Sequence, residues 1–154
     1  VISVEPSNKH LDIVSELCDK YKIHAALHNH PNPSKYWNPD VVLASLEGRS
    51  QYMGATADIG HWMRSGLDPV ACLKKLEGRV LHLHFKDLNA FGDLNAHDVH
   101  WGTGKLPIDG VIAELKRQQF KGMLSAEYEY HWNSNKEDVK ASVINLRELL
   151  NKKR

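Results

Sequence analysis

The chain has 154 residues, and its 20 Lys and Arg nearly balance 19 Asp and Glu, with a sequence pI of about 8.0. This length suits one domain, residues 1–154, with a sizeable buried core. The balanced charge argues against a nucleic-acid partner, and the lack of a long apolar run or a visible signal peptide argues against a membrane. Cys18 and Cys72 lie on apolar sides of helical patterns, which predicts buried free thiols and a cytoplasmic location.

Five short segments read as β-strands in chain order. They are VISVEP (1–6), IHAALHNHP (23–31), GATADIGHW (54–62), VLHLHFKD (80–87) and MLSAEYEYHW (123–132). Apolar and β-branched residues alternate with polar ones along them, as expected for strands. Each segment ends in ionisable residues, which predicts that functional side chains lie at the ends of the strands.

Helical patterns with clear punctuation lie between these strands. Ser7 is a candidate N-cap for a helix that reaches Tyr21. Asn38-Pro39 and Asp68-Pro69 each combine an N-cap with Pro at the first helical position. Two further helices are expected, near 109–119 and 134–150. The alternation of strands and helices predicts an α/β fold of about five βα units on a parallel sheet.

Strand side chains alternate between two faces, and one face of this sheet is unusually polar. The first face carries apolar residues such as Leu27, Leu83 and Phe85. The second face carries Ser3, Glu5, His24, His28, His30, Thr56, Asp58, His82, His84, Lys86, Ser125, Glu127 and Glu129. A parallel sheet that is only structural should be apolar on both faces. This pattern is typical of a metal or acid/base site inside a barrel.

Each candidate site residue could also have a purely structural role. His82, His84 and Lys86 line one strand, which favours function over a lone satisfied core histidine. Asp58 could instead cap the turn that follows it. Glu127 and Glu129 repel each other on one face unless a cation or a proton relieves them. A mixed Asp, His and Glu set suits Mn, Co or Zn, and suits Mg less well.

The loops after the strands carry all four tryptophans, Trp37, Trp62, Trp101 and Trp132. Such rings either cap the hydrophobic layer or form platforms for sugar rings. In the loop after residue 88, GTGK (102–105) lacks the spacing of a phosphate-binding P-loop, although its glycines could cross a tight loop near a ligand. We expect most of the polar side chains in that loop to be solvated, namely Asn89, His97, Asp98 and His100.

Four motifs in order, ALHNHP, ADIGHW, HLHFKD and AEYEY, resemble the xylose isomerase-like barrels. That superfamily includes sugar isomerases, sugar-phosphate isomerase/epimerases, inosose dehydratases and endonuclease IV. The resemblance covers essentially the whole chain and matches the carboxyl-terminal part of an eight-unit barrel. It implies a partial (β/α) TIM barrel, with about three amino-terminal units absent from this chain.

The resemblance also implies a divalent metal held by Glu, Asp, His and Glu at successive strand ends. Asp58, His84 and Glu127 match three of these positions. The first Glu is missing, and either His28 replaces it as a ligand or Glu5 reaches in from the preceding strand.

The resemblance further implies roles around the metal. His61 matches a position that contacts the substrate, with His30 and Lys86 nearby and Trp62 and Trp101 as candidate platforms. For catalysis the candidates are Glu127, Glu129, His61 and Lys86, with Glu129 or His28 as the group opposing Glu127. These roles predict proton abstraction beside a carbonyl.

We therefore expect a metal-dependent isomerase or epimerase acting on a small sugar or sugar phosphate. The alternatives are a dehydratase or lyase acting on a keto-inositol or keto-sugar, an endonuclease IV-like phosphodiesterase, or a non-catalytic fragment. The phosphodiesterase would need a basic face that the charge balance does not supply. An open sheet would expose its edge strands, so we expect a homodimer or a higher homo-oligomer.

Overall fold

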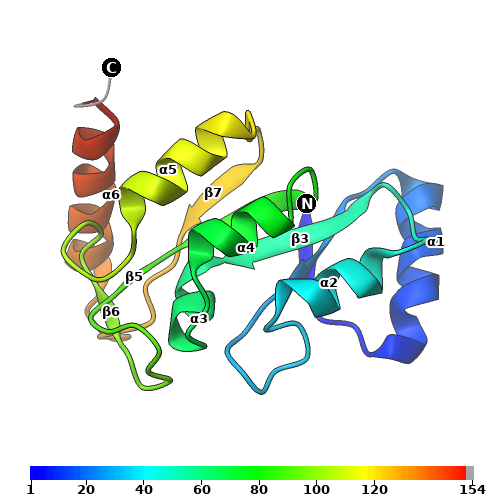
Figure 1. The fold of residues 1–154 in the computed structure, drawn as a ribbon, viewed down its shortest axis with the longest axis horizontal. Coiled ribbons are helices and arrows are strands. Elements are labelled where there is room, and N and C mark those ends of the chain that lie inside the picture. The colour runs from blue at the N-terminus through cyan, green and yellow to red at the C-terminus, as the bar shows by residue number, and fades with distance from the viewer. Residues whose placement is uncertain (152–154) are drawn as a thin grey trace.

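The computed structural model describes residues 1–151 and has five parallel strands in one sheet. In the spatial order of the sheet these are β1 (Ile2–Val4), β2 (Ala25–His28), β3 (Met53–Asp58), β4 (Val80–Phe85) and β7 (Met123–Ala126). Each strand pairs in parallel with the next, so all five carboxyl ends meet at one edge. The five predicted strands and the partial (β/α) barrel are thus confirmed (Figure 1).

Most helices begin and end near the capping and stop signals in the sequence. They are α1 (Leu11–Tyr21), α2 (Pro39–Leu46), α3 (Ile59–Arg64), α4 (Pro69–Lys75), α5 (Ile108–Arg117) and α6 (Lys136–Asn151). Asn38 and Asp68 cap α2 and α4 by accepting backbone N–H bonds, with Pro at the first helical position of each. The predicted Ser7 cap is wrong, because a 3₁₀ turn, η1 (Asn8–His10), precedes α1 and the Ser7 hydroxyl bonds His10 Nδ1 instead.

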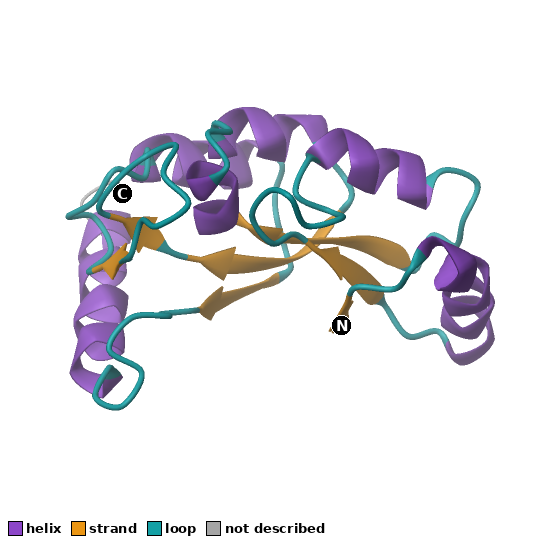
Figure 2. Cartoon of the chain, turned by 90° about the horizontal axis from the view of Figure 1, so that it is seen from below, coloured by secondary structure: helices purple, strands orange, loops and turns teal. Residues whose placement is uncertain are grey.

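Within residues 1–151, the helices cover one face of the sheet. The apolar side chains of Leu27, Leu83 and Phe85 are fully buried beneath them. In Figure 2 the helical layer arches over the sheet, while the opposite face has no helix across it. Burial of the apolar face supplies the driving force for folding, and the polar face is left concave and accessible as the inside of a half-barrel.

A register shift in the β3–β4 ladder aligns the candidate site residues at the ends of these two strands. The ladder shifts between Ala55 and Thr56, and beyond that point Asp58 lies opposite His84. Gly54 sits just before the shift, and a Cβ there would lie 2.4 Å from the Arg79 carbonyl oxygen. Only glycine allows this backbone approach.

A buried carboxylate organises the long connection between β4 and α5. Asp87 begins β5 (Asp87–Leu88), which pairs in antiparallel fashion with β6 (Asp98–Val99). Its two oxygens accept backbone N–H bonds from Leu88, Gly102, Gly104 and Leu106, at 2.8–2.9 Å. The GTGK glycines therefore wrap around an internal acid, which satisfies their backbone donors without any external ligand.

Both cysteines are buried and free, as the sequence predicted. Burial is the main cause that raises the pKa of the Cys72 thiol to about 12, which makes it unreactive near neutral pH. Among the described residues, none of the helices combines the length and apolar character needed to cross a bilayer.

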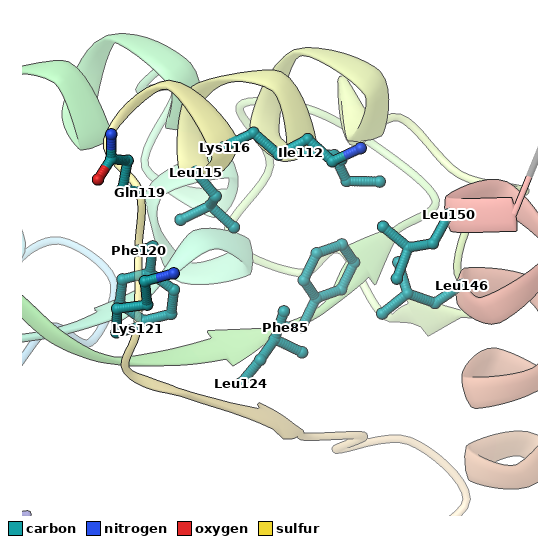
Figure 3. Close-up of a pocket in the computed structure, with 10 residues that line it drawn as sticks. All are labelled: Phe85, Ile112, Leu115, Lys116, Gln119, Phe120, Lys121, Leu124, Leu146 and Leu150. Carbon is teal, nitrogen blue, oxygen red and sulfur yellow. The ribbon is translucent and has the colours of Figure 1, made fainter. Parts of the chain in front are cut away.

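The two outer strands leave the sheet open. Within residues 1–151, β1 pairs only with β2 and β7 pairs only with β4. Ile2 on β1 is 54% exposed and Met123 on β7 is 67% exposed. Beside β7 lies an apolar groove of about 390 Å³, into which side chains from β4, β7, α5 and α6 point (Figure 3). A second apolar groove of about 190 Å³ lies between β1 and α1.

We propose that these edges mediate association with a second copy, because unpaired strands and exposed apolar side chains favour pairing. Sedimentation at micromolar concentration should show a dimer or a larger species. Met123→Glu on the exposed edge should shift the distribution toward monomer, whereas Val41→Glu on α2 should not. A wild-type monomer at every concentration would contradict this proposal.

Candidate metal centre

Four candidate ligands lie at neighbouring strand ends. His28 ends β2, Asp58 ends β3, His84 lies in β4 opposite Asp58, and Glu127 directly follows β7. The parallel pairing places all four on the concave face at one edge of the sheet. Residues separated by about a hundred positions are thereby brought together, as the alternation of the sequence predicted.

One atom from each of these residues points to a common space. The four ligand atoms lie within 4.8 Å of one another. Asp58 Oδ2 is 3.7 Å from His28 Nε2 and 3.7 Å from His84 Nδ1, and His84 Nδ1 also contacts Glu127 Oε2. These same four atoms are buried, and their contacts with one another and with Lys86 are ion pairs that lack regular hydrogen-bond geometry.

This set fits a divalent cation. Buried polar atoms without partners are unfavourable, and four that converge call for a group that satisfies them together. Two imidazole nitrogens and two carboxylate oxygens are a donor set suited to Zn, Mn or Co. Burial disfavours charge on His84, but contacts with Asp58 and Glu127 outweigh it and raise the pKa of His84 to about 9. The site therefore attracts positive charge, whether a proton or a metal ion.

Asn29 holds the Asp58 end of the site, a role that the sequence analysis missed. Its Nδ2 donates to the Asp58 carbonyl at 2.9 Å, and its Oδ1 accepts from the Asp58 N–H at 2.7 Å. The His61 N–H donates to Asp58 Oδ1 at 2.9 Å, so Asp58 is also the cap of α3. The capping alternative and the ligand role coexist, because each uses a different carboxylate oxygen.

Lys86 is the cation at the base of the site. Its fully buried ammonium lies 3.1 Å from Asp58 Oδ2, 3.3 Å from Glu127 Oε1 and 2.6 Å from Glu129 Oε2. Burial opposes ionisation of Asp58, but Lys86 and its other neighbours outweigh burial and hold the pKa of Asp58 well below its usual range. Lys86 thus keeps the ligand set ionised and presents no exposed surface for a substrate.

A second cation, Arg64, completes the network and was not foreseen from the sequence. Its guanidinium lies 2.7 Å from Glu129 Oε2 and 3.3 Å from Asp98 Oδ2. Burial opposes ionisation of Glu129, yet Lys86 and Arg64 lower its pKa to about 2. A carboxylate with so low a pKa is a weak proton acceptor. In this structure Glu129 forms ion pairs with both cations.

Asp98 is the buried exception in the polar loop, where we expected most side chains to be solvated. It is 1% exposed, and burial raises its pKa to about 6 despite the nearby Lys86 and Arg64. With neutral imidazoles, the four carboxylates of Asp58, Asp98, Glu127 and Glu129 exceed the two cations by two negative charges. A bound cation, or the proton that His84 takes up in its absence, offsets that excess.

His61 lies between the two cations. Its Nδ1 is 3.0 Å from Arg64 Nη1 and its Nε2 is 3.3 Å from Lys86 Nζ. Burial lowers the pKa of His61 to about 4, so the ring is neutral near pH 7. His30, by contrast, has a side chain that is 43% exposed and faces Glu5 at 2.8 Å. Of these two predicted substrate contacts, His30 is the more accessible.

The two tryptophans predicted as sugar platforms lie in the core. Trp62 and Trp101 are each 1% exposed, and Trp101 packs on Phe85 with ring centroids 4.8 Å apart. Neither offers an open ring face, because Trp62 lies in α3, Trp101 lies in the loop after β6, and both rings are buried in the core. Trp132 is the exposed tryptophan, at 73%.

Replacing Lys86 by Met should strongly destabilise the protein, because Asp58 would lose its nearest cation and Glu129 would lose one of its two cationic partners. We expect the free energy of unfolding to fall by about 3–5 kcal/mol in chelator-treated protein, measured by urea denaturation. The control, Lys75→Met, removes an exposed pair with Asp40 and should cost less than about 1 kcal/mol. If both variants lost less than about 1 kcal/mol of unfolding free energy, Lys86 would not be a required counter-charge for the buried carboxylates.

Comparison with known proteins places this arrangement in a family. A D-tagatose 3-epimerase-like protein superposes with a TM-score of 0.79 at 26% identity, over 94% of this chain and 53% of that one. An uncharacterised protein from Parabacteroides distasonis has 40% identity and a TM-score of 0.63, over 96% and 57%. The IOLI protein, solved with a zinc atom, has 17% identity and a TM-score of 0.71, over 99% and 61%.

The chain thus spans about half the length of the first two of these structures. No curated protein matches its sequence significantly. The model of the family described as xylose isomerase-like TIM barrel matches residues 8–149, which confirms the resemblance seen in the four motifs. The chain therefore belongs to the xylose isomerase-like TIM barrel family.

Proposed function

We propose that this site serves a metal-dependent isomerase or epimerase acting on a ketose or ketose phosphate. The observation that carries the proposal is the convergence of four buried ligand atoms, from His28, Asp58, His84 and Glu127, none of which forms a regular hydrogen bond. The family, the epimerase-like neighbour and the zinc atom in the IOLI structure support it.

The four residues would hold one divalent ion, with Zn, Mn and Co suited to the mixed donors and Mg less so. When bound, such an ion supplies Lewis-acid stabilisation of the negative charge that develops on a ketose carbonyl oxygen as a neighbouring carbon loses its proton. The rest of the chemistry falls to the side chains of the chain itself.

Glu127 is the best-placed proton acceptor among the described residues. It directly follows the edge strand β7 and its side chain is 29% exposed, whereas the Asp58 side chain is fully buried. Glu129 stays bound to Lys86 and Arg64, so we assign it, with Lys86, to holding Glu127 and Asp58 in place. His61 links both cations, and His30 lies at the open side where a sugar hydroxyl could reach it.

Isomerisation moves a proton between adjacent carbons on one face of an intermediate, and one base is sufficient for it. Epimerisation inverts a carbon and needs a proton donor on the opposite face. Of the two carboxylates in the ligand cluster, Glu127 is the accessible one, because the Asp58 side chain is fully buried; Glu5, whose side chain is 40% exposed, lies outside the cluster behind His28. The described residues thus favour isomerisation, or elimination in a dehydratase, unless an opposing donor comes from outside them.

Metal binding should depend on each carboxylate and imidazole of the cluster. Asp58→Ala, His84→Ala and Glu127→Ala should each abolish stoichiometric zinc, measured by elemental analysis after gel filtration. Asp138→Asn, which alters an Asp that contacts His100 and His131 elsewhere, should retain it. Full metal occupancy in all three alanine variants would rule out this ligand set.

The reaction should exchange a carbon-bound proton with solvent. A panel of ketoses incubated with the metal-loaded protein in heavy water should gain deuterium beside the carbonyl, as seen by NMR. Glu127→Gln should slow exchange by at least about 100-fold, because the variant lacks both a positioned base and a carboxylate ligand of the metal. Product analysis separates an isomer, an epimer and a dehydrated sugar. Turnover that keeps a carbon-bound deuterium label within the substrate would indicate hydride transfer instead.

A further inference from the structure

Glu5 lies behind His28, on the far side of the ring from the ligand cluster. Its Oε1 is 3.7 Å from His28 Nδ1, whereas His28 Nε2 faces Asp58 Oδ2. We propose that Glu5 is a positioning residue that keeps the ring proton of His28 on Nδ1 and so turns the Nε2 lone pair toward the cation. The proposal rests on the metal site of the proposed function.

The sheet fixes this arrangement. In the β1–β2 register Val4 lies opposite Leu27, so Glu5 and His28 are the next residues along each strand. Glu5 is held in turn by His30, whose Nδ1 is 2.8 Å from the same Oε1. The His28 ring packs between the His30 and His84 rings, with centroid distances of 4.5 and 4.7 Å. Its side chain is 11% exposed, so it has little freedom to turn away.

A neutral imidazole carries its proton on either nitrogen, and a nearby carboxylate stabilises the tautomer with the N–H on its own side. A carboxylate behind a ligating histidine also makes that histidine a stronger donor to a metal. The sequence left two alternatives open, with either His28 or Glu5 as the fourth ligand. The structure combines them, because His28 supplies the ligand atom and Glu5 supplies negative charge from behind.

Glu5, His28 and His30 also form a second group whose ligand atoms lie within 4.8 Å of one another. A second cation there would have to use the Glu5 carboxylate that faces His28 Nδ1. The side chains of Glu5 and His30 are 40% and 43% exposed and already pair with each other. We therefore favour the positioning role, and the experiment below separates the two uses.

The test is a double-mutant cycle on zinc affinity. Glu5→Gln should weaken zinc binding about 10-fold, the lower end of the effect of such supporting carboxylates. In a His28→Glu background the same change should have no effect, because a carboxylate ligand has no tautomer to fix. Glu47→Gln, an exposed residue after α2, is the control and should leave affinity unchanged.

A second measurement does not depend on metal. Nitrogen-15 NMR of the metal-free protein should show His28 protonated on Nδ1, with the Nε2–H form appearing in Glu5→Gln. An unchanged tautomer or an unchanged zinc affinity in Glu5→Gln would overturn the proposal. Two zinc ions per wild-type chain, falling to one in Glu5→Gln, would also overturn it in favour of a second site. If wild type binds no zinc, the proposed function fails, and the tautomer alone decides the role of Glu5.

Discussion

The structure depends on the concentration of negative charge at the carboxyl ends of its parallel strands. Asp58 has no exposed surface, yet its carboxylate shares the Lys86 ammonium with the carboxylates of Glu127 and Glu129, which follow β7. Such a charge is strongly unfavourable in a protein interior unless cations and hydrogen bonds surround it. Lys86, at 3.1 Å, is the nearest permanent cation.

The neighbouring elements can be understood as support for that cluster. Asn29 ties β2 to the end of β3, Arg64 on α3 neutralises the outer carboxylates, and the register shift beside Gly54 aligns Asp58 with His84. Farther away, Asp87 gathers the backbone of the following loop and so fixes β6, which carries Asp98. Rigid placement of this kind is what a metal or catalytic site requires.

Much of this arrangement was predictable from local pattern. Alternation alone placed His28, Asp58, His84 and Glu127 on one face, since strand side chains have a fixed period. The Asn-Pro and Asp-Pro pairs marked the starts of α2 and α4 because a cap and a proline act within a few residues. Family resemblance then added the identity of the metal ligands, which pattern could not supply.

The remainder depends on contacts between distant segments. Arg64 and Asp98 lie on different elements with no shared motif, and their ion pair exists only because the loop after β5 folds back onto α3. The burial of Trp62 and Trp101 has the same origin, because the sequence shows where a ring is attached but not what packs over it. Ser7 was misread because a serine before a helical pattern can equally precede a 3₁₀ turn.

The most direct test of the central claim is the coordination shell of a bound metal. X-ray absorption spectroscopy of the zinc-loaded protein reports the number and type of ligand atoms without a crystal. The structure predicts two imidazole nitrogens from His28 and His84 together with carboxylate oxygens from Asp58 and Glu127, at distances of about 2.0–2.2 Å. A shell of oxygen atoms alone, without the scattering pattern of imidazole rings, would contradict the account.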